Sequence, residues 1–337
     1  MKTGFPKVLG YIVLCALPLL AVTLALGVGR YGLSPRAVLE ALALGPAAAA
    51  DNPASKIVYN VRLPRALLAL LVGSGLSVAG CCFQAVFSNP LASPDTLGVS
   101  SGAAFGAAIG IVISGGIVLT QIFSISCGLL AIGLTFLLSR SHRNSNVLMI
   151  VLAGVITSAL FNALVSSVKY FADPTTKLPE ITYWLMGSMM GASYHDITIA
   201  LPLVFLPVIL IFFIRWRLNV LILSDEEITS LGVKTSVMRW LVILLCTLII
   251  AACVSVCGQV GWVGLVIPHM ARRVVGYDHK ILIPTCASAG GTYLLLIDTL
   301  ARSLTAGELP LSILTAVIGV PIFVLLFFRR GEKSLET

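Results

Sequence analysis

The chain has 337 residues, of which 58% are hydrophobic and only 11% are charged, and its mean hydropathy is +1.02. These values exclude an ordinary soluble domain and indicate a polytopic membrane protein. The formal net charge of +8 therefore reflects orientation in a bilayer, and nucleic-acid binding is excluded as its explanation.

Apolar stretches follow one another along the whole sequence. A membrane helix needs about 20 apolar residues. About ten candidate spans meet or approach that length, at 8–29, 64–87, 96–113, 116–139, 147–170, 195–214, 238–257, 262–275, 281–300 and 311–328. The eighth is too short to cross alone. The sequence predicts an all-α polytopic transmembrane helical bundle, formed by a single membrane domain over 1–337.

The Lys and Arg residues predict how these spans are oriented. With the N-terminus inside, 14 of the 22 basic residues fall on the cytoplasmic side and 8 fall outside. Such an excess inside is typical of membrane proteins. An even number of spans then places both termini in the cytoplasm.

Polar residues interrupt the apolar sequence between 62 and 106. Arg62 and Arg65 precede the second span, Gln84 lies within it, and Asn89-Pro90 follows it. Polar groups are costly in hydrocarbon and normally face the bundle interior or water. Proline cannot donate an N–H group, so Asn89-Pro90 ends this helix and forms either a hinge or a simple turn.

A strip of small residues opens the third span. Gly98, Gly102, Gly106 and Gly110 recur every four residues, which places them on one helical face. Without side chains there, a neighbouring backbone can approach closely. The spacing predicts a tight helix–helix contact.

The fifth span carries a polar stripe. Ser158, Asn162, Ser166 and Lys169 are spaced by four, four and three residues and therefore share one face. Together with Gln84 they are candidates for the wall of a translocation path. The alternative is hydrogen bonding between helices by Ser and Asn, with Lys169 extending towards the membrane surface.

Catalytic and metal-binding patterns are weak. All eight cysteines fall inside proposed spans, where a free thiol behaves as a small apolar group. Cys253 and Cys257 would share a face but lack nearby histidines, so we expect no metal site. His269 beside Pro268 is typical of a hydrogen-bonded packing residue. The sequence has no Walker A loop, no Ser/His/Asp set and no HExxH motif, which argues against ATP binding and against an enzyme.

Several motifs together resemble a known family. They are RLPR at 62–65, Gln84, NPLASPDTLGVSSGA at 89–103, GLVIPHMAR at 264–272 and ELPLSILTAVIGVPIF at 308–323. In this order they are similar to the iron-chelate and vitamin B12 permeases, which are the FecCD-type membrane subunits of binding-protein-dependent ABC importers. The similarity runs from about residue 60 to 328.

The resemblance implies the partners and the location. It implies a permease of the bacterial or archaeal cytoplasmic (inner) membrane that pairs with a second copy of itself or with a different permease. Two ABC ATPase subunits would bind ATP and Mg, an extracytoplasmic binding protein would deliver the substrate, and this chain would hold no cofactor. The cargo would be a metal chelate, with a ferric siderophore first and haem or cobalamin next.

The resemblance also implies roles for individual residues. The segment 217–236 would form the loop that docks into the ATPase, through Leu221, Leu223, Ser224, Asp225, Glu226, Glu227, Leu231 and Gly232. Asn144, Ser145 and Asn146 would form a cytoplasmic gate. Arg62, Arg65 and Arg302 would meet acidic residues of the binding protein, because a guanidinium can hold a carboxylate bidentately. Alternatively, arginine there binds lipid headgroups or Asp298, and Asp298 and Arg302, four residues apart, would also form an ion pair.

Two other functions remain open. The same importer architecture could carry an oxyanion such as molybdate or tungstate. An ion-coupled secondary transporter would need a carboxylate near the middle of the bilayer, whereas Asp and Glu avoid the span centres.

Overall fold

The computed structural model describes residues 7–49, 51–140, 147–223, 227, 235–305 and 307–334, and this part of the chain contains helices and no strands. The helices are α1 (Lys7–Gly27), α2 (Pro35–Leu44), η1 (Pro46–Ala49), α3 (Pro53–Ile57), η2 (Val58–Arg62), α4 (Leu63–Val86), η3 (Pro94–Leu97), α5 (Val99–Val112), α6 (Gly116–Arg140), α7 (Val147–Phe171), α8 (Lys177–Leu185), α9 (Tyr194–Ile214), η4 (Arg215–Arg217), α10 (Leu218–Leu221), α12 (Ser236–Cys257), α13 (Val263–Val275), α14 (His279–Leu304) and α15 (Leu311–Ser334).

Each of the ten predicted stretches coincides with one of these helices. They are α1, α4, α5, α6, α7, α9, α12, α13, α14 and α15. Six helical segments in the described residues are long and apolar enough to cross a membrane, and α1, α5 and α15 contribute shorter apolar segments. The all-helical membrane fold is confirmed, and the count of ten spans stays a prediction.

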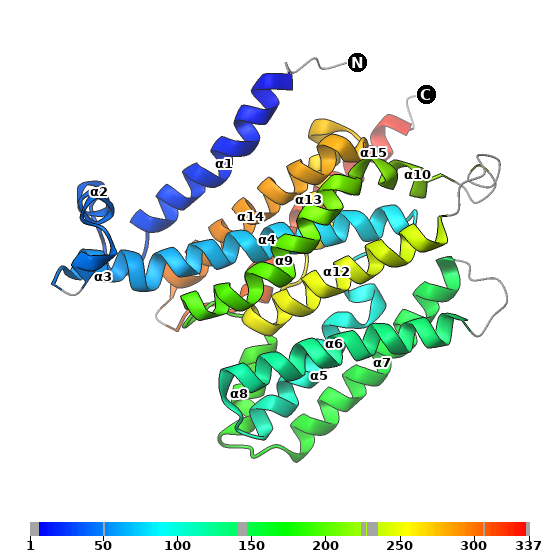
Figure 1. Cartoon of the computed structure of the whole chain (residues 1–337), viewed down its shortest axis with the longest axis horizontal. Coiled ribbons are helices and arrows are strands. Elements are labelled where there is room, and N and C mark those ends of the chain that lie inside the picture. Colours follow the sequence, from blue (N-terminus) through cyan, green and yellow to red (C-terminus); the bar gives the residue numbers. More distant parts are fainter. Residues whose placement is uncertain are drawn as a thin grey trace.

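The helix ends separate into two sides of the bundle. The beginning of α1, the short helix α10 and the end of α15 lie towards one side, whereas α2, α3 and α8 lie towards the other (Figure 1). The segments 62–65 and 302–308 therefore come together at the second side, because α4 begins there and α14 ends there.

Helix α4 forms the centre of the molecule. In the most apolar 18-residue stretch of its span, 78% of the residues are buried, and α4 packs against α14, α12, α13 and α9. Gly73 lies against the backbone of Gly290, and Gly80 lies against the backbone of Gly264, so closely that an added Cβ would overlap a carbonyl group. Missing side chains thus allow α14 and α13 to approach α4 at backbone distance.

The predicted glycine contact is confirmed between α5 and α6. Gly102, Gly106 and Gly110 all lie against the backbone of α6, where a Cβ would overlap it. Gly98 has a different environment, because it precedes α5 with a positive φ of 78° and faces Thr157 of α7. A left-handed conformation of this kind favours glycine.

The Asn-Pro motif forms a turn outside α4. The helix ends at Val86, and the Asn89 side chain then accepts a hydrogen bond from the backbone N–H of Leu91 at 2.9 Å. Such a side-chain bond to the backbone two residues later is typical of turns. Of the two predicted interpretations, the structure favours the turn.

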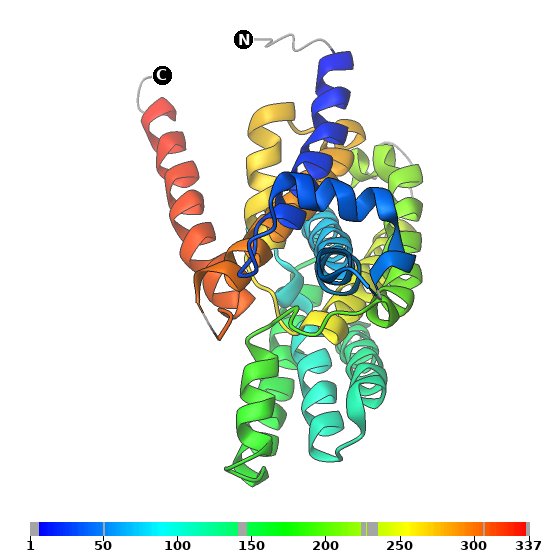
Figure 2. The ribbon, with the colours of Figure 1, turned by 90° about the vertical axis from the view of Figure 1, so that its left-hand side faces the viewer.

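Three helices lie at the periphery of the chain. In the most apolar 18-residue stretch, only 33% of the residues of α7 and 22% of those of α9 are buried. Helix α15 contacts α13 and α14 near its beginning and then stands apart from the other helices (Figure 2). These helices offer wide apolar surfaces to lipid or to another protein chain.

Candidate functional site

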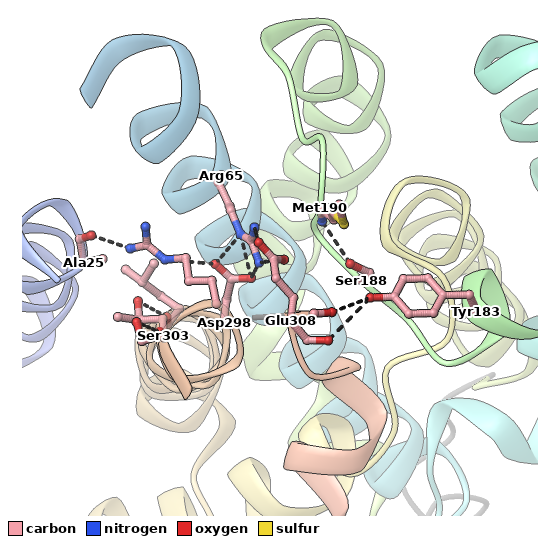
Figure 3. Close-up of polar contacts among 12 residues, drawn as sticks. Ala25, Arg65, Tyr183, Ser188, Met190, Asp298, Ser303 and Glu308 are labelled. Carbon is pink, nitrogen blue, oxygen red and sulfur yellow. Dashed lines mark hydrogen bonds and ion pairs between the residues drawn. The ribbon is translucent and has the colours of Figure 1, made fainter. Parts of the chain in front are cut away.

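An ion-pair cluster occupies the place where α4 begins and α14 ends (Figure 3). Arg65 donates from Nε and Nη2 to both carboxylate oxygens of Asp298, with N–O distances of 2.8–3.0 Å. It also contacts Glu308, at 3.1 Å from Nη1 to Oε1 and 2.9 Å from Nη2 to Oε2. The Asp298 side chain is only 1% exposed. A bidentate arginine is the partner that such a buried carboxylate requires.

Arg62 and Arg302 bind the end of α1. Arg62 donates to the carbonyls of Leu26 at 2.5 Å, Gly27 at 3.0 Å and Tyr31 at 2.5 Å, and Arg302 donates to the carbonyl of Ala25. The last carbonyls of a helix have no partner within the helix and carry a partial negative charge. The two arginines therefore fasten α1 to α4 and α14.

Glu308 links this cluster to the start of α15. Its backbone has a positive φ of 48°, which is uncommon for a residue with a side chain. The Tyr183 hydroxyl on α8 donates to the Glu308 carbonyl at 3.4 Å, while the first residue of α15, Leu311, donates to the carbonyl of Gly187 at 2.9 Å. The ion pair with Arg65 and these backbone contacts hold α4, α8 and α15 together.

The three arginines predicted to dock a binding protein are thus buried and bonded within the chain. Arg62, Arg65 and Arg302 are each less than 10% exposed. The structure favours the alternative in which arginine binds Asp298, although the partner is chiefly Arg65, because the nearest Arg302–Asp298 distance is 4.0 Å. Contact with a second protein stays a prediction. Sequence spacing could suggest the pair four residues apart but not the pair separated by 233 residues.

Gln84 bonds to another helix at the opposite end of α4. Its Oε1 accepts from Arg272 Nη1 at 2.5 Å, and its Nε2 donates to the Gly264 carbonyl at 3.5 Å. The residue is buried. On α13, the His269 ring nitrogen Nε2 lies 2.8 Å from the Pro90 carbonyl, and the ring packs edge-on against Phe323. His269 is the predicted packing residue, and Gln84 fastens α4 to α13.

The middle of the polar stripe of α7 is exposed. Asn162 and Ser166 are exposed and Ser158 is half-buried. Helix α7 packs against α5, α6 and η3, whereas Gln84 lies on α4 in the contact with α13. The structure therefore separates Gln84 from the other three residues that were predicted to line a path.

The predicted coupling segment is described only in part. Leu221 at the end of α10 is buried, and its carbonyl accepts from the Ser88 hydroxyl at 3.3 Å. Leu223 is half-buried and Glu227 is exposed. Leu221 therefore belongs to the core rather than to a docking surface. The other coupling residues lie outside the described residues, as does the proposed gate: Ser224, Asp225, Glu226, Leu231, Gly232, Asn144, Ser145 and Asn146.

Helix α10 is attached to the beginning of α14. The Asn219 amide donates from Nδ2 to Asp278 at 2.8 Å and accepts from the backbone N–H of His279 at 2.9 Å. Asp278 also accepts from the backbone N–H of Lys280 as the N-cap of α14. The hydrogen bonds from Lys280 and Asn219 lower the pKa of Asp278 below its usual value, because they stabilise the ionised carboxylate. The carboxylate is thus charged at neutral pH.

Metal ligands do not gather among the described residues. No group of three or more His, Cys, Asp or Glu residues there could hold a metal ion. Cys253 and Cys257 share a helical face as predicted, and the Cys257 thiol donates to the Cys253 carbonyl at 3.0 Å. These thiols are buried among apolar side chains of the core.

Known proteins share both the sequence and the fold. A sequence profile of the FecCD transport family matches residues 17–329. The chain belongs to this family. It is 40% identical over 336 residues to the molybdate import system permease MolB of Haemophilus influenzae, covering 99% of this chain and 98% of that protein. It is 41% identical over 282 residues to a probable iron chelatin transport permease of Helicobacter pylori, covering 82% of this chain and 84% of that protein.

A solved structure supports the same assignment. It is an inward-facing conformation of a protein assigned as a metal-chelate type ABC transporter, with 38% sequence identity and a TM-score of 0.86 over 96% of this chain and all of that chain. The predicted FecCD-type permease family is confirmed. The chain is therefore a multi-pass permease subunit of the inner membrane, and the ATPase of such a transporter is a separate protein.

Proposed function

We propose that this FecCD-type permease imports a metal chelate, with a ferric siderophore as the first candidate. The relatives named for iron chelatin and the metal-chelate type transporter support this cargo. An external binding protein delivers the substrate, and two partner ATPases bind ATP and Mg. All ten apolar helices, including the short α13, contribute to the membrane domain, with both termini in the cytoplasm.

The observation that carries the transport proposal is the exposed polar stripe of α7. Asn162 and Ser166 lie on a membrane helix whose apolar window is only one-third buried. The Ser166 hydroxyl donates to the Asn162 carbonyl of its own helix at 2.9 Å, whereas the exposed Asn162 amide would be unfavourable against lipid. This face would therefore meet another protein surface or water. A second copy of the permease, packed on α7 and α15, would enclose a path between the two copies. Ser158, Asn162 and Ser166 would line it.

The attachment of α10 to α14 supports coupling to ATP. The segment 217–236 would move with the ATPase, and Asn219 and Leu221 would pass that movement to α14 and α4 through the contacts described above. In this proposal the exposed Glu227 contacts the ATPase, while the buried Leu221 passes the movement of the segment to α4. The gate at 144–146 would open the path to the cytoplasm.

The external arginines then have a structural part in docking. Arg62, Arg65 and Arg302 would set the positions of α1, α4 and the turn before α15, and these segments would form the surface that the binding protein meets. Direct contact with a carboxylate of that protein would require an arginine to leave Asp298, Glu308 or the end of α1. Substrate selectivity would lie mainly with the binding protein, so tight binding of substrate by purified permease alone would contradict the proposal.

A specific observation favours molybdate or tungstate as a second candidate. The molybdate permease of Haemophilus influenzae matches nearly the whole chain at 40% identity, against 41% for the shorter iron chelatin match. Ser158, Asn162 and Ser166 are polar but uncharged, so this part of α7 would pass an oxyanion as well as a bulky chelate.

Uptake into proteoliposomes distinguishes the two cargoes. The permease is reconstituted with the ATPase and binding protein encoded by its neighbouring genes, and labelled ferric siderophore, haem, cobalamin and molybdate are supplied in turn. We expect ferric siderophore uptake that needs ATP and all three components. Uptake of molybdate alone would establish the second candidate, and uptake driven by an ion gradient without the ATPase would overturn the proposed mechanism.

A further inference from the structure

A shallow cavity lies where α9 ends and α14 begins. Its volume is about 290 Å³, and it is lined by Phe213, Arg215, Trp216 and Lys280. Two aromatic and two cationic side chains thus share one small surface. The cavity lies at the end of a long apolar span, on the side of the bundle where α10 lies (Figure 1).

Arg215 is held against the backbone of Lys280 by neutral groups. Arg215 donates from Nε to the Lys280 carbonyl at 2.9 Å and from Nη1 to the Phe212 carbonyl at 2.6 Å. Its guanidinium carbon also lies 3.6 Å from the centre of the Phe212 ring. Carbonyl dipoles and an aromatic face orient a guanidinium without neutralising its charge. Arg215 is therefore fixed in place while its positive charge remains.

The acidic residue next to the cavity already has hydrogen-bond partners of its own. Neither Arg215 nor Lys280 forms an ion pair with a carboxylate in the described part of the chain. Asp278 is the neighbouring acid; it bonds to Asn219 and to the backbone N–H of Lys280, and its charge also attracts the Lys280 side chain. Lys280 itself is exposed. Even with the charge of Asp278 counted, Arg215 and Lys280 leave a net positive charge at this surface, which attracts an anion.

The surroundings of the cavity are those of the membrane surface. Phe213 is 70% exposed and Trp216 is 50% exposed at the end of α9, the least buried of the long spans. Aromatic side chains at a span end mark the headgroup level of a bilayer. The exposed Leu206 and Leu210 extend the apolar face of α9 from there into the hydrocarbon region. An anion with attached acyl chains fits this surface better than a free anion does.

We propose that this cavity binds the phosphate of an anionic phospholipid between Arg215 and Lys280, with the acyl chains along the exposed face of α9. Basic pockets between helices at the membrane surface have the chemistry to hold such headgroups. The bound lipid would join the end of α9 to the beginning of α14 and so support the junction at Asn219.

Lipid retention by the full-length permease tests the proposal. The protein is purified in detergent, equilibrated with vesicles of either phosphatidylglycerol or phosphatidylcholine, and its bound lipid is counted by native mass spectrometry. We expect preferential retention of phosphatidylglycerol, and a loss of about fivefold in that preference for each charge removed in Arg215→Gln/Lys280→Gln. Arg217→Gln is the matched control, because Arg217 lies 5.1 Å from the Trp216 ring but does not line the cavity.

The remaining arms separate the sources of the phosphate. Inorganic phosphate added during equilibration should leave the bound phosphatidylglycerol in place, and its displacement would show a soluble-anion site and overturn the proposal. Equal retention of the two lipids, or an equal loss in Arg217→Gln, would overturn it as well. If the double variant does not fold, Lys280→Gln alone decides the outcome, because this side chain is exposed and its loss should leave the fold intact.

Discussion

Helices α4 and α7 have almost the same hydropathy and occupy opposite environments. Their apolar windows have mean hydropathies of 2.1 and 2.3, yet the first is 78% buried and the second 33% buried. The difference lies in their small residues. Gly73 and Gly80 of α4 each lie against the backbone of another helix, so α4 is surrounded by close neighbours. Hydropathy alone therefore identifies a membrane helix, while small residues on several faces identify a central one.

The polar residues of the two helices differ in the same way. Arg65 and Gln84 of α4 bond to side chains of α14 and α13, respectively, within the chain. Asn162 and Ser166 of α7 are exposed instead. A polar group that is bonded inside one chain stabilises that chain. A polar group on the outside of a membrane helix serves an interface or an aqueous path.

The largest effect should come from removing the arginine of the buried cluster. Arg65→Ala leaves the fully buried Asp298 carboxylate without its bidentate partner and also releases Glu308. Breaking a buried ion pair from one side costs about 3–5 kcal/mol. We expect a large fall in the midpoint of thermal unfolding, or loss of folded protein on size-exclusion chromatography.

An exposed ion pair provides the control for this variant. Arg36 and Glu40 on α2 form a pair at 2.8 Å, with side chains that are 88% and 57% exposed. Surface pairs contribute about 0–1 kcal/mol. Arg36→Ala should therefore unfold within a few degrees of the parent protein. Similar midpoints for Arg65→Ala and Arg36→Ala would show that the cluster does not stabilise the fold.

The next effect tests the glycine contacts of α4. In Gly80→Ala the new Cβ would overlap the backbone of Gly264, and α4 and α13 would have to separate. Overpacking of this kind costs about 1–3 kcal/mol. Gly133→Ala on α6 is the matched control, since a Cβ there meets nothing within 4 Å. Thermal unfolding should show a loss for the first variant only, because alanine otherwise favours a helix over glycine. An equal loss in both would show that the contact with Gly264 does not set the cost.

The helices and their order could be predicted from the sequence. Apolar length located all ten helices, and glycine spacing located the contact between α5 and α6, because both depend on neighbouring residues along the chain. The end of α4 before Asn89-Pro90 followed from proline chemistry in the same way, whereas the choice between a hinge and a turn did not. Local patterns of this kind are visible in one sequence.

The partners of the polar residues could not be predicted. Arg65 and Asp298 are separated by 233 residues, and Gln84 and Arg272 by 188. Only the packing of α4 against α14 and α13 brings them together. Gln84 and Asn162 look alike in sequence, as single polar residues within apolar spans, but one bonds to a neighbour and the other is exposed. Function was predicted from the family motifs, which include Arg65, Gln84 and Arg272, and not from the partners of these residues.

Replacing one polar residue of each helix by leucine distinguishes the buried environment of α4 from the exposed environment of α7. Gln84→Leu removes the acceptor of Arg272 and should cost about 1–3 kcal/mol, because a buried donor loses its partner. Asn162→Leu should change the free energy of unfolding by no more than about 0.5 kcal/mol, since the residue is exposed. In proteoliposomes, however, Asn162→Leu should lower the uptake rate if α7 lines the path. An unchanged rate would remove Asn162 from the proposed path.

The smallest effect concerns the cap of α14. Asp278→Ala removes an N-cap and the acceptor of Asn219, at a cost of about 1 kcal/mol. Because the folded protein lowers the pKa of Asp278, its contribution is complete above the unfolded value of about 3.9 and is lost as the pH falls through the folded value. The difference in unfolding midpoint between the parent and Asp278→Ala should therefore stay constant from pH 8 to pH 5 and shrink only below about pH 4. A difference that shrank already between pH 7 and pH 5 would assign the titration to another group.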